Sequence, residues 1–273
     1  MAVSGSTRVI GFIGSSYEKS RIYDIYNKAF DALALDFVYV PFHVADIAAA
    51  CDAIRALGIH AAGVTIPFKV SAMPLLDSID DAARRTGAVN FIVNTDGRLH
   101  GGNTDGAGAV RALEEAAPVA RRRVCILGSG GAARAIAADL LSAEATVHLV
   151  SVDPRECTAL TQSVGGEGHD WKDLAREVRA ADIVINSTPI GMAGTSMEGE
   201  TPVPGTLLRT GQIVMDLVTA PSETPLMREA RDQGAQVVTG ERMLRWQALL
   251  KLPHFTGAVL TPDQRERFLA DSF

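Results

Sequence analysis

The sequence is poor in cysteine: only Cys51, Cys125 and Cys157 occur among its 273 residues. They lie far apart, their number is odd, and no two of them form a Cys-x-x-Cys pair. These features exclude a disulfide framework and a cysteine-based zinc site, and they indicate a reducing compartment. We therefore expect a cytoplasmic protein.

Basic charge, clustered histidines and long apolar runs are also lacking. The formal net charge is −6, so the chain has no basic field for holding nucleic acid. No apolar run approaches the roughly 18 residues that a membrane span needs, and the start of the chain does not resemble a signal peptide. The six histidines, at positions 43, 60, 100, 148, 169 and 254, show no metal-ligand spacing. We expect a small-molecule partner, no metal, no nucleic acid and no membrane, in a monomer or a homodimer.

Short apolar runs alternate with helical patterns, which is typical of a parallel sheet covered by helices. Early in the chain, strands are expected at 8–14, 36–42 and 59–66, with helices at 20–33 and 44–57. Residues 90–102 differ, because two short extended runs flank Asp96-Gly97, a strong hairpin signal. This hairpin is expected to end a first lobe.

A second lobe is expected to begin with a helix at 104–117. Its strands are expected at 122–128, 145–150, 182–188, 212–218 and 235–240, and its helices at 130–142 and 222–234. Residues 192–205 are rich in Gly, Pro, Ser and Thr and should form a loop.

The predicted fold class is therefore α/β with two lobes. An N-terminal open α/β substrate domain should span 1–103 and be rejoined by helices at 241–273, and a Rossmann-type dinucleotide-binding domain should span 104–240. Ligands of open α/β sheets bind at the carboxyl ends of the strands, so the cleft between the lobes is the expected site.

A glycine-rich turn lies in CILGSGGAARAI, residues 125–136. Gly128, Gly130 and Ala133 form a G-x-G-x-x-A pattern between an expected strand and an expected helix. Gly128 permits the tight turn, Gly130 lets the backbone approach a pyrophosphate, and the helix N-terminus attracts the phosphates. The competing interpretation is a tight turn that binds nothing.

The next strand end, LVSVDPRE at 149–156, bears on the choice of dinucleotide. An acidic residue there favours a free 2′-hydroxyl, and an arginine accommodates a 2′-phosphate. Asp153 therefore favours NAD, whereas Arg155 leaves NADP open.

Two strand exits carry candidate catalytic groups. GVTIPFK ends in Lys69, and GGNTDG contains Asp105. Oxidation of a secondary alcohol by a nicotinamide cofactor needs a base for the hydroxyl proton, and a lysine beside a carboxylate can hold and pass it. Alternatively, Lys69 is a solvated strand cap and Asp105 an N-cap of the following helix.

Several motifs occur in the order seen in shikimate dehydrogenases, and the resemblance covers nearly the whole chain. They are GVTIPFK, GAVN (87–90), GGNTDG, GSGGAA, NSTPIGM (186–192), MDLVTAPSETPL (215–226) and GERMLRWQ (240–247). The resemblance implies an NAD(P)-dependent oxidoreductase acting on a hydroxylated cyclohexene or cyclohexane carboxylate, such as shikimate, quinate or a relative.

The resemblance also implies roles for individual residues. Lys69 and Asp105 match the catalytic pair. Substrate contacts are implied for Ser20, Thr65, Asn90 and Gln247. Cofactor contacts are implied for Gly128, Ser129, Gly130, Gly131, Ala132, Asp153, Asn186, Thr188, Pro189, Leu217 and Gly240.

The sequence departs from the family where ligands are recognised. The family's Ser-x-Ser-Pro grips the substrate carboxylate, but Ile22 replaces its second serine and Tyr23 its proline. Ser15, Ser16, Tyr23 and Tyr26 are possible substitutes. Gly63 replaces an asparagine that contacts a substrate hydroxyl, and Thr219 replaces a tyrosine. Ser151-Val152-Asp153 replaces the NADP-type Asn-Arg-Thr.

These departures spare Lys69, Asp105 and the glycine turn, so we expect dehydrogenase chemistry with an altered substrate and a preference for NAD. Two alternatives remain from the residues: a metabolite sensor without turnover, and another two-lobed dehydrogenase such as a methylene-tetrahydrofolate enzyme.

Overall fold

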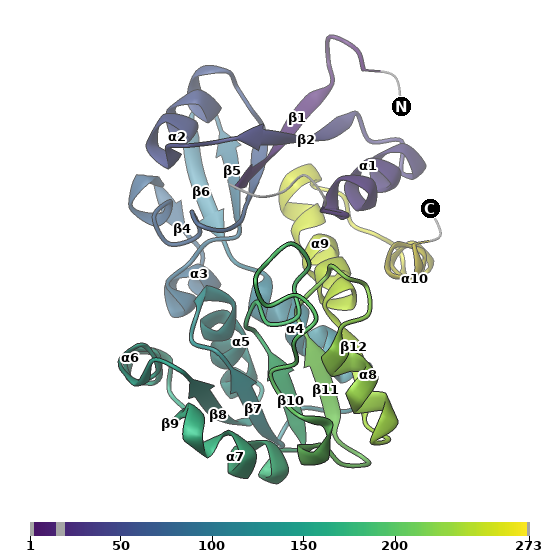
Figure 1. Cartoon of the computed structure of the whole chain (residues 1–273). Helices are drawn as coiled ribbons and strands as arrows, with labels where there is room; N and C mark the ends of the chain where they lie inside the picture. The colour runs from purple at the N-terminus through teal and green to yellow at the C-terminus, as the bar shows by residue number, and fades with distance from the viewer. Residues whose placement is uncertain (1–2, 15–19, 272–273) are drawn as a thin grey trace. The chain divides into compact units, whose positions relative to one another are not determined.

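The computed structural model describes residues 3–14 and 20–271 and divides the chain into two compact units (Figure 1). The first unit contains residues 1–104 and 245–273, and the second contains residues 105–244. Within the described residues, the strands form two six-stranded sheets. None of the described helices combines the length and the hydropathy that a membrane span requires.

The sheet of the first unit is mixed and has the strand order β2-β1-β3-β5-β6-β4, with β5 antiparallel to both of its neighbours. Its strands are β1 (Arg8–Gly14), β2 (Phe37–His43), β3 (Ala61–Val64), β4 (Ser78–Ile79), β5 (Phe91–Thr95) and β6 (Arg98–Gly102). β1 pairs in parallel with β2 and β3, as the alternation of strands and helices predicts. β5 and β6 form the predicted hairpin, in which Asp96 (φ 51°) and Gly97 (φ 84°) make the turn.

The two faces of this sheet differ in their side chains. Ile13, Val64 and Ile92 pack with buried residues of α2 (Ile47–Ala56) in an aliphatic cluster. Strand alternation turns the neighbouring positions to the other face. There Tyr39 and Phe91 meet aromatic rings from α1 (Ile22–Ala32) and α9 (Gly240–Thr256). The returning chain thus supplies part of the first unit's core, notably Phe255, which is fully buried. Two further helices of this unit are α3 (Asp81–Thr86) and α10 (Pro262–Ala270).

The sheet of the second unit is parallel, with the order β12-β11-β10-β7-β8-β9. Its strands are β7 (Arg123–Leu127), β8 (Thr146–Ser151), β9 (Glu167–Asp170), β10 (Ile183–Asn186), β11 (Ile213–Asp216) and β12 (Gln236–Thr239). The first three strands run outward from β7 and the last three outward from β10, which is the doubly wound Rossmann order. The order reverses between β7 and β10, where such sheets bind their ligands.

Helices accompany these strands as expected for parallel crossovers. They are α4 (Asp105–Glu114), α5 (Gly131–Ser142), α6 (Pro154–Val164), α7 (Leu174–Ala180) and α8 (Pro225–Asp232). Buried apolar residues of β7, β10 and β11 pack with Val178 of α7 and Leu226 of α8. The expected elements omitted α6, β9 and α7 in this unit, and β4 and α3 in the first unit. β9 reads Glu-Gly-His-Asp, so this edge strand has no apolar run that could reveal it.

Candidate functional site

The exit of β3 holds Lys69 in a hydrogen-bonded turn. The Thr65 N–H donates to Ile13 O (2.9 Å), and the Phe68 N–H donates back to Thr65 O (3.0 Å). The Phe68 side chain is buried in the aliphatic cluster. The Lys69 carbonyl then accepts from the Val89 N–H (2.8 Å). The backbone around Lys69 is therefore attached to β1 and to the segment before β5.

Asn90 forms the centre of a second part of this site in the first unit. It is only 2% exposed. Its Nδ2 donates to Thr104 Oγ1 (3.1 Å), and its Oδ1 accepts from the Thr104 N–H (3.0 Å). Thr104 Oγ1 is in turn 3.4 Å from the backbone oxygen of Gln247. Asn90 is also joined to β3, because its carbonyl accepts from the Val64 N–H (2.9 Å). Hydrogen bonds thus connect Asn90 with the backbone around Thr65 and Gln247.

Asp105 directly follows Thr104 and is the first residue of α4. It is 2% exposed, which is unusual for a carboxylate at a helix start. The positive end of a helix dipole favours a negative charge at this position. The bonds between Asn90 and Thr104 fix the backbone immediately before it.

The segment expected to contact the substrate carboxylate is described only in part. Ser20 Oγ accepts from the Ile22 N–H (3.3 Å), so this hydroxyl supports the start of α1. Ile22 is 1% exposed and belongs to the core, which agrees with the loss of a polar group there. Ser15 and Ser16, the possible substitutes, lie outside the described residues.

The glycine turn joins β7 to α5 in the second unit. Gly128 has φ 103°, which a residue with a side chain rarely adopts. Gly130 and Gly131 differ, because a Cβ built at either position meets no atom within 4 Å. The fold itself therefore gives no steric reason for these two glycines, whereas close approach of a pyrophosphate does. Ala132 follows in the first turn of α5, whose N-terminal N–H groups suit the phosphates.

Two carboxylates lie next to this turn. Ser129 Oγ donates to Glu156 Oε2 (3.0 Å) and is 2.9 Å from Ser151 Oγ. Asp153 caps α6 by accepting from the backbone N–H groups of Arg155 (2.8 Å) and Glu156 (3.3 Å). The backbone hydrogen bond from Arg155 is the main reason that the pKa of Asp153 lies below its usual range. Both acids follow β8, the strand end expected to meet the adenosine ribose.

The ends of β10 and β11 share a buried polar network that sequence reasoning missed in part. Asn186 Nδ2 donates to Asp216 Oδ1 (2.9 Å), and Asn186 Oδ1 accepts from the N–H (3.0 Å) and Oγ1 (2.6 Å) of Thr188. Thr224 Oγ1 donates to Asp216 Oδ2 (2.6 Å). Burial raises the pKa of Asp216, although these hydrogen bonds act against the rise. An aspartate inside the apolar run QIVMDLV was the available signal for this network.

The remaining predicted cofactor residues lie at the same end of this sheet. Leu217 directly follows β11, and Gly240 directly follows β12. A Cβ at Gly240 would lie 2.5 Å from Leu217 O, so glycine is required for this close backbone contact. Pro189 is exposed beside Thr188. The structure therefore brings most of the predicted cofactor residues to the carboxyl ends of β7, β10, β11 and β12.

A histidine cluster corrects the expectation of scattered histidines. In the described part of the chain, the pairing of β8 with β9 brings His148, Glu167 and His169 together, with ligand atoms within 4.8 Å of one another. However, Arg123 Nη2 donates to His148 Nδ1 (3.2 Å) and to Glu177 Oε2 (2.6 Å). A guanidinium thus occupies the lone pair that a metal ion needs, and we assign the cluster as a hydrogen-bonded network.

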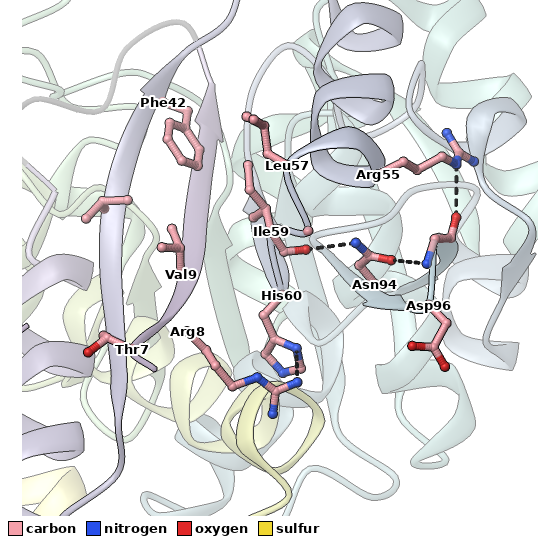
Figure 2. Close-up of a pocket in the computed structure, with 13 residues that line it drawn as sticks. Thr7, Arg8, Val9, Phe42, Arg55, Leu57, Ile59, His60, Asn94 and Asp96 are labelled. Carbon is pink, nitrogen blue, oxygen red and sulfur yellow. Dashed lines mark hydrogen bonds between the residues drawn. The ribbon is translucent and has the colours of Figure 1, made fainter. Parts of the chain in front are cut away.

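A large cavity of about 870 Å³ lies elsewhere in the first unit (Figure 2). Its lining includes residues near the starts of β1 and β3 and residues of the β5–β6 turn. None of the predicted site residues lines it. Several of its polar groups are already paired. Arg8 Nη2 donates to His60 Nδ1 (2.6 Å), and His60 Nε2 is 2.6 Å from Phe255 O. Asn94 donates to Ile59 O (3.0 Å). Thr7, Arg8, Ile59 and His60 place much of its lining at the amino ends of β1 and β3, opposite the ends at which such sheets bind ligands, and Val40 and Phe42 of β2 complete it.

Comparison with known proteins agrees with the features of both units. The family model described as the shikimate dehydrogenase substrate binding domain matches residues 12–92. A protein from Moorella thermoacetica named shikimate dehydrogenase (NADP(+)) is 40% identical over an alignment of 282 positions, which covers 99% of this chain and 95% of that protein.

Solved structures give the same result. A shikimate dehydrogenase in complex with NADP+ has a TM-score of 0.91 at 34% identity, with 99% of this chain and 97% of that chain covered. Shikimate 5-dehydrogenase from Listeria monocytogenes, in complex with shikimate and NAD, has a TM-score of 0.86 at 31% identity, with 98% of each chain covered.

Proposed function

Because this chain belongs to the shikimate dehydrogenase family of NAD(P)-dependent oxidoreductases, we propose that its substrate is a hydroxylated cyclohexene or cyclohexane carboxylate. The reaction is a reversible hydride transfer between the nicotinamide and a ring carbon that carries a hydroxyl group. The observation that carries this proposal is the hydrogen-bonded arrangement of Asn90, Thr104 and Gln247 beside the Lys69 turn. Membership of this family excludes the methylene-tetrahydrofolate alternative.

We assign substrate binding to the first unit and dinucleotide binding to the second. Lys69 holds or releases the proton of the reacting hydroxyl, and Asp105 is the carboxylate of the catalytic pair. Thr65, Asn90 and Gln247 contact the ring hydroxyls. The dinucleotide supplies the hydride acceptor when it is bound, and the glycine turn holds its pyrophosphate through N–H groups of α5.

We further propose NAD as the preferred dinucleotide, although the relatives described above are associated with NADP(+) as well as NAD. Val152 cannot pair with a 2′-phosphate, and the nearby Asp153 and Glu156 repel it. Exposed Arg155 is the one neighbouring cation in the strand-end segment, and it lies 3.7 Å from Asp153. A free 2′-hydroxyl can instead donate a hydrogen bond to a carboxylate.

The three cysteines are free and buried, which supports a cytoplasmic location. We propose small molecules as the partners of a monomer or homodimer.

The test is a spectrophotometric assay of purified protein with NAD and NADP against shikimate, quinate and related polyol acids. We expect dinucleotide reduction with at least one acid, and a larger kcat/KM with NAD. Lys69→Ala should lower kcat by about 10²–10⁴-fold, the usual contribution of a proton-transfer group. Exposed Lys172→Ala is the matched control and should leave kcat unchanged. Tight NAD binding without turnover of any acid would support the sensor alternative instead.

A further inference from the structure

The hydroxyl of Tyr39 is buried without a hydrogen-bond partner among the described residues. Tyr39 lies in β2, and the residue is 2% exposed. Its neighbour Tyr26 is equally buried, but the Tyr26 hydroxyl donates to Ala248 O (3.2 Å). Buried polar groups nearly always have partners, because leaving one unpaired is unfavourable. The Tyr39 hydroxyl therefore needs an explanation that the fold alone does not give.

This hydroxyl points at Gly63 in β3. A Cβ built on Gly63 would lie 2.3 Å from Tyr39 Oη and 2.9 Å from Phe12 Cδ2. Side chains two residues apart on a strand face the same side, so position 63 shares its side with Thr65. Thr65 is one of the proposed substrate contacts. The unpaired hydroxyl therefore lies on the substrate side of β3.

The distance of 2.3 Å from a Cβ built on Gly63 to Tyr39 Oη matches the dimensions of an amide side chain. By ordinary bond lengths and angles, an asparagine holds its terminal oxygen and nitrogen roughly 2.4 Å from its own Cβ. Tyr39 Oη therefore lies as far from position 63 as the polar atoms of an asparagine there would lie. Glycine at 63 leaves the space that the phenol enters.

The position of Tyr39 is well determined by its contacts. Its N–H donates to Asn27 Oδ1 (2.8 Å), and its carbonyl accepts from Asn27 Nδ2 (3.0 Å). Its ring stacks on Tyr26, with centroids 4.6 Å apart, and lies 6.0 Å from the rings of both Phe12 and Tyr23. Burial raises the pKa of Tyr39 well above its ordinary value, so the group stays a phenol that can donate and accept.

We propose that Tyr39 Oη hydrogen-bonds a ring hydroxyl of the substrate and thereby determines specificity, an assignment that rests on the proposed function. Phe12 and Tyr23 give this part of the site an apolar lining. The site then selects a cyclic polyol acid with one hydroxyl at Tyr39 and apolar ring carbons beside it.

The first experiment compares Tyr39→Phe with Tyr26→Phe in steady-state kinetics and thermal unfolding. Tyr39→Phe should raise the KM of the ring substrate by about 10–100-fold, change kcat and the dinucleotide KM little, and leave the unliganded protein at least as stable. Tyr26→Phe removes a paired hydroxyl and should instead lower the melting temperature.

The outcomes separate this assignment from the proposed function. Turnover by the wild type with an unchanged substrate KM in Tyr39→Phe overturns the assignment alone. A drop in melting temperature as large as that of Tyr26→Phe also overturns it, because the hydroxyl then has a structural partner. If the wild type turns over none of the acids, the proposed function and this assignment fail together.

A second experiment moves the polar group from one residue to the other. Gly63→Asn alone should lower the melting temperature, because its Cβ collides with Tyr39 Oη and Phe12. The double variant Tyr39→Ala/Gly63→Asn should have a substrate KM at least tenfold lower than that of Tyr39→Ala. The asparagine amide then places a polar atom near the position that Tyr39 Oη occupies in the wild type. No improvement in the double variant would mean that Oη does not occupy a substrate-binding position.

Discussion

Gly130→Ala separates the effect of the glycine turn on dinucleotide binding from its effect on folding. Gly130 has φ −71°, which alanine adopts without strain, and its Cβ would enter open space. The unliganded protein should therefore unfold at the same temperature as the wild type, or slightly higher because alanine restricts the unfolded chain.

The dinucleotide should bind more weakly, because the added methyl group lies at the position that we propose for the pyrophosphate at the start of α5. Displacing the phosphate from one backbone N–H removes a hydrogen bond to a charged group, which contributes about 1.5–3 kcal/mol. The dissociation constant should then rise by about 10–100-fold. The assay is fluorescence titration with NAD and with NADP, together with the KM of each dinucleotide at a fixed concentration of ring acid.

Gly5→Ala is the matched control. Gly5 also has no atom within 4 Å of a built Cβ, and it lies in the first unit, far from the turn in sequence. It should change neither stability nor affinity. A wild-type dissociation constant in Gly130→Ala would refute the assignment of this turn to the pyrophosphate, and a lower melting temperature would refute the steric argument.

Three further predictions concern the cofactor, the buried network and acid stability. Asp153→Ser keeps an N-cap oxygen but removes the charge. The ratio of kcat/KM for NADP to that for NAD should therefore rise about tenfold. An unchanged ratio would show that Asp153 does not determine the dinucleotide preference. Thr224→Val should lower the free energy of unfolding by about 1–3 kcal/mol in denaturant titrations, because Asp216 loses a buried donor, whereas Thr224→Ser should retain most of the stability. Burial lowers the pKa of His60 in the folded protein. As the pH falls below about 6.5, the unfolded chain therefore binds a proton at this histidine more readily than the folded chain does. The free energy of unfolding should then decrease with acidification. Melting temperatures between pH 7.5 and 5.5 should depend less on pH in His60→Asn than in the wild type, and an exposed His43→Asn control should retain the wild-type slope.

Local patterns were sufficient to predict much of the fold. β1 and β7 are apolar runs with little interruption, and such runs indicate buried parallel strands. Asp96-Gly97 predicted the hairpin, because both residues adopt the positive φ that its turn needs. β9 could not be predicted in this way, because a polar edge strand depends on its neighbour β8 rather than on its own hydropathy.

The same distinction between local patterns and tertiary contacts applies to the candidate site. Lys69, Asp105 and the glycine turn were named from motifs whose chemistry is local to a few residues. Asp216 was not predicted as a site residue, because its role depends on hydrogen bonds from Asn186 and Thr224, and Asn186 reaches it only after β10 and β11 pair.

The sequence by itself determined the α/β alternation, the strand–glycine–helix turn and the family to which the chain belongs, since each depends on residues close together or on their order. Only the tertiary structure decided which polar groups meet. It showed that Gly63 is more than a lost asparagine, because the Tyr39 hydroxyl from a neighbouring part of the sheet enters its space. It also brought His148 and His169 together across β8 and β9. Such contacts depend on strand order and side-chain direction, which no short stretch of sequence contains.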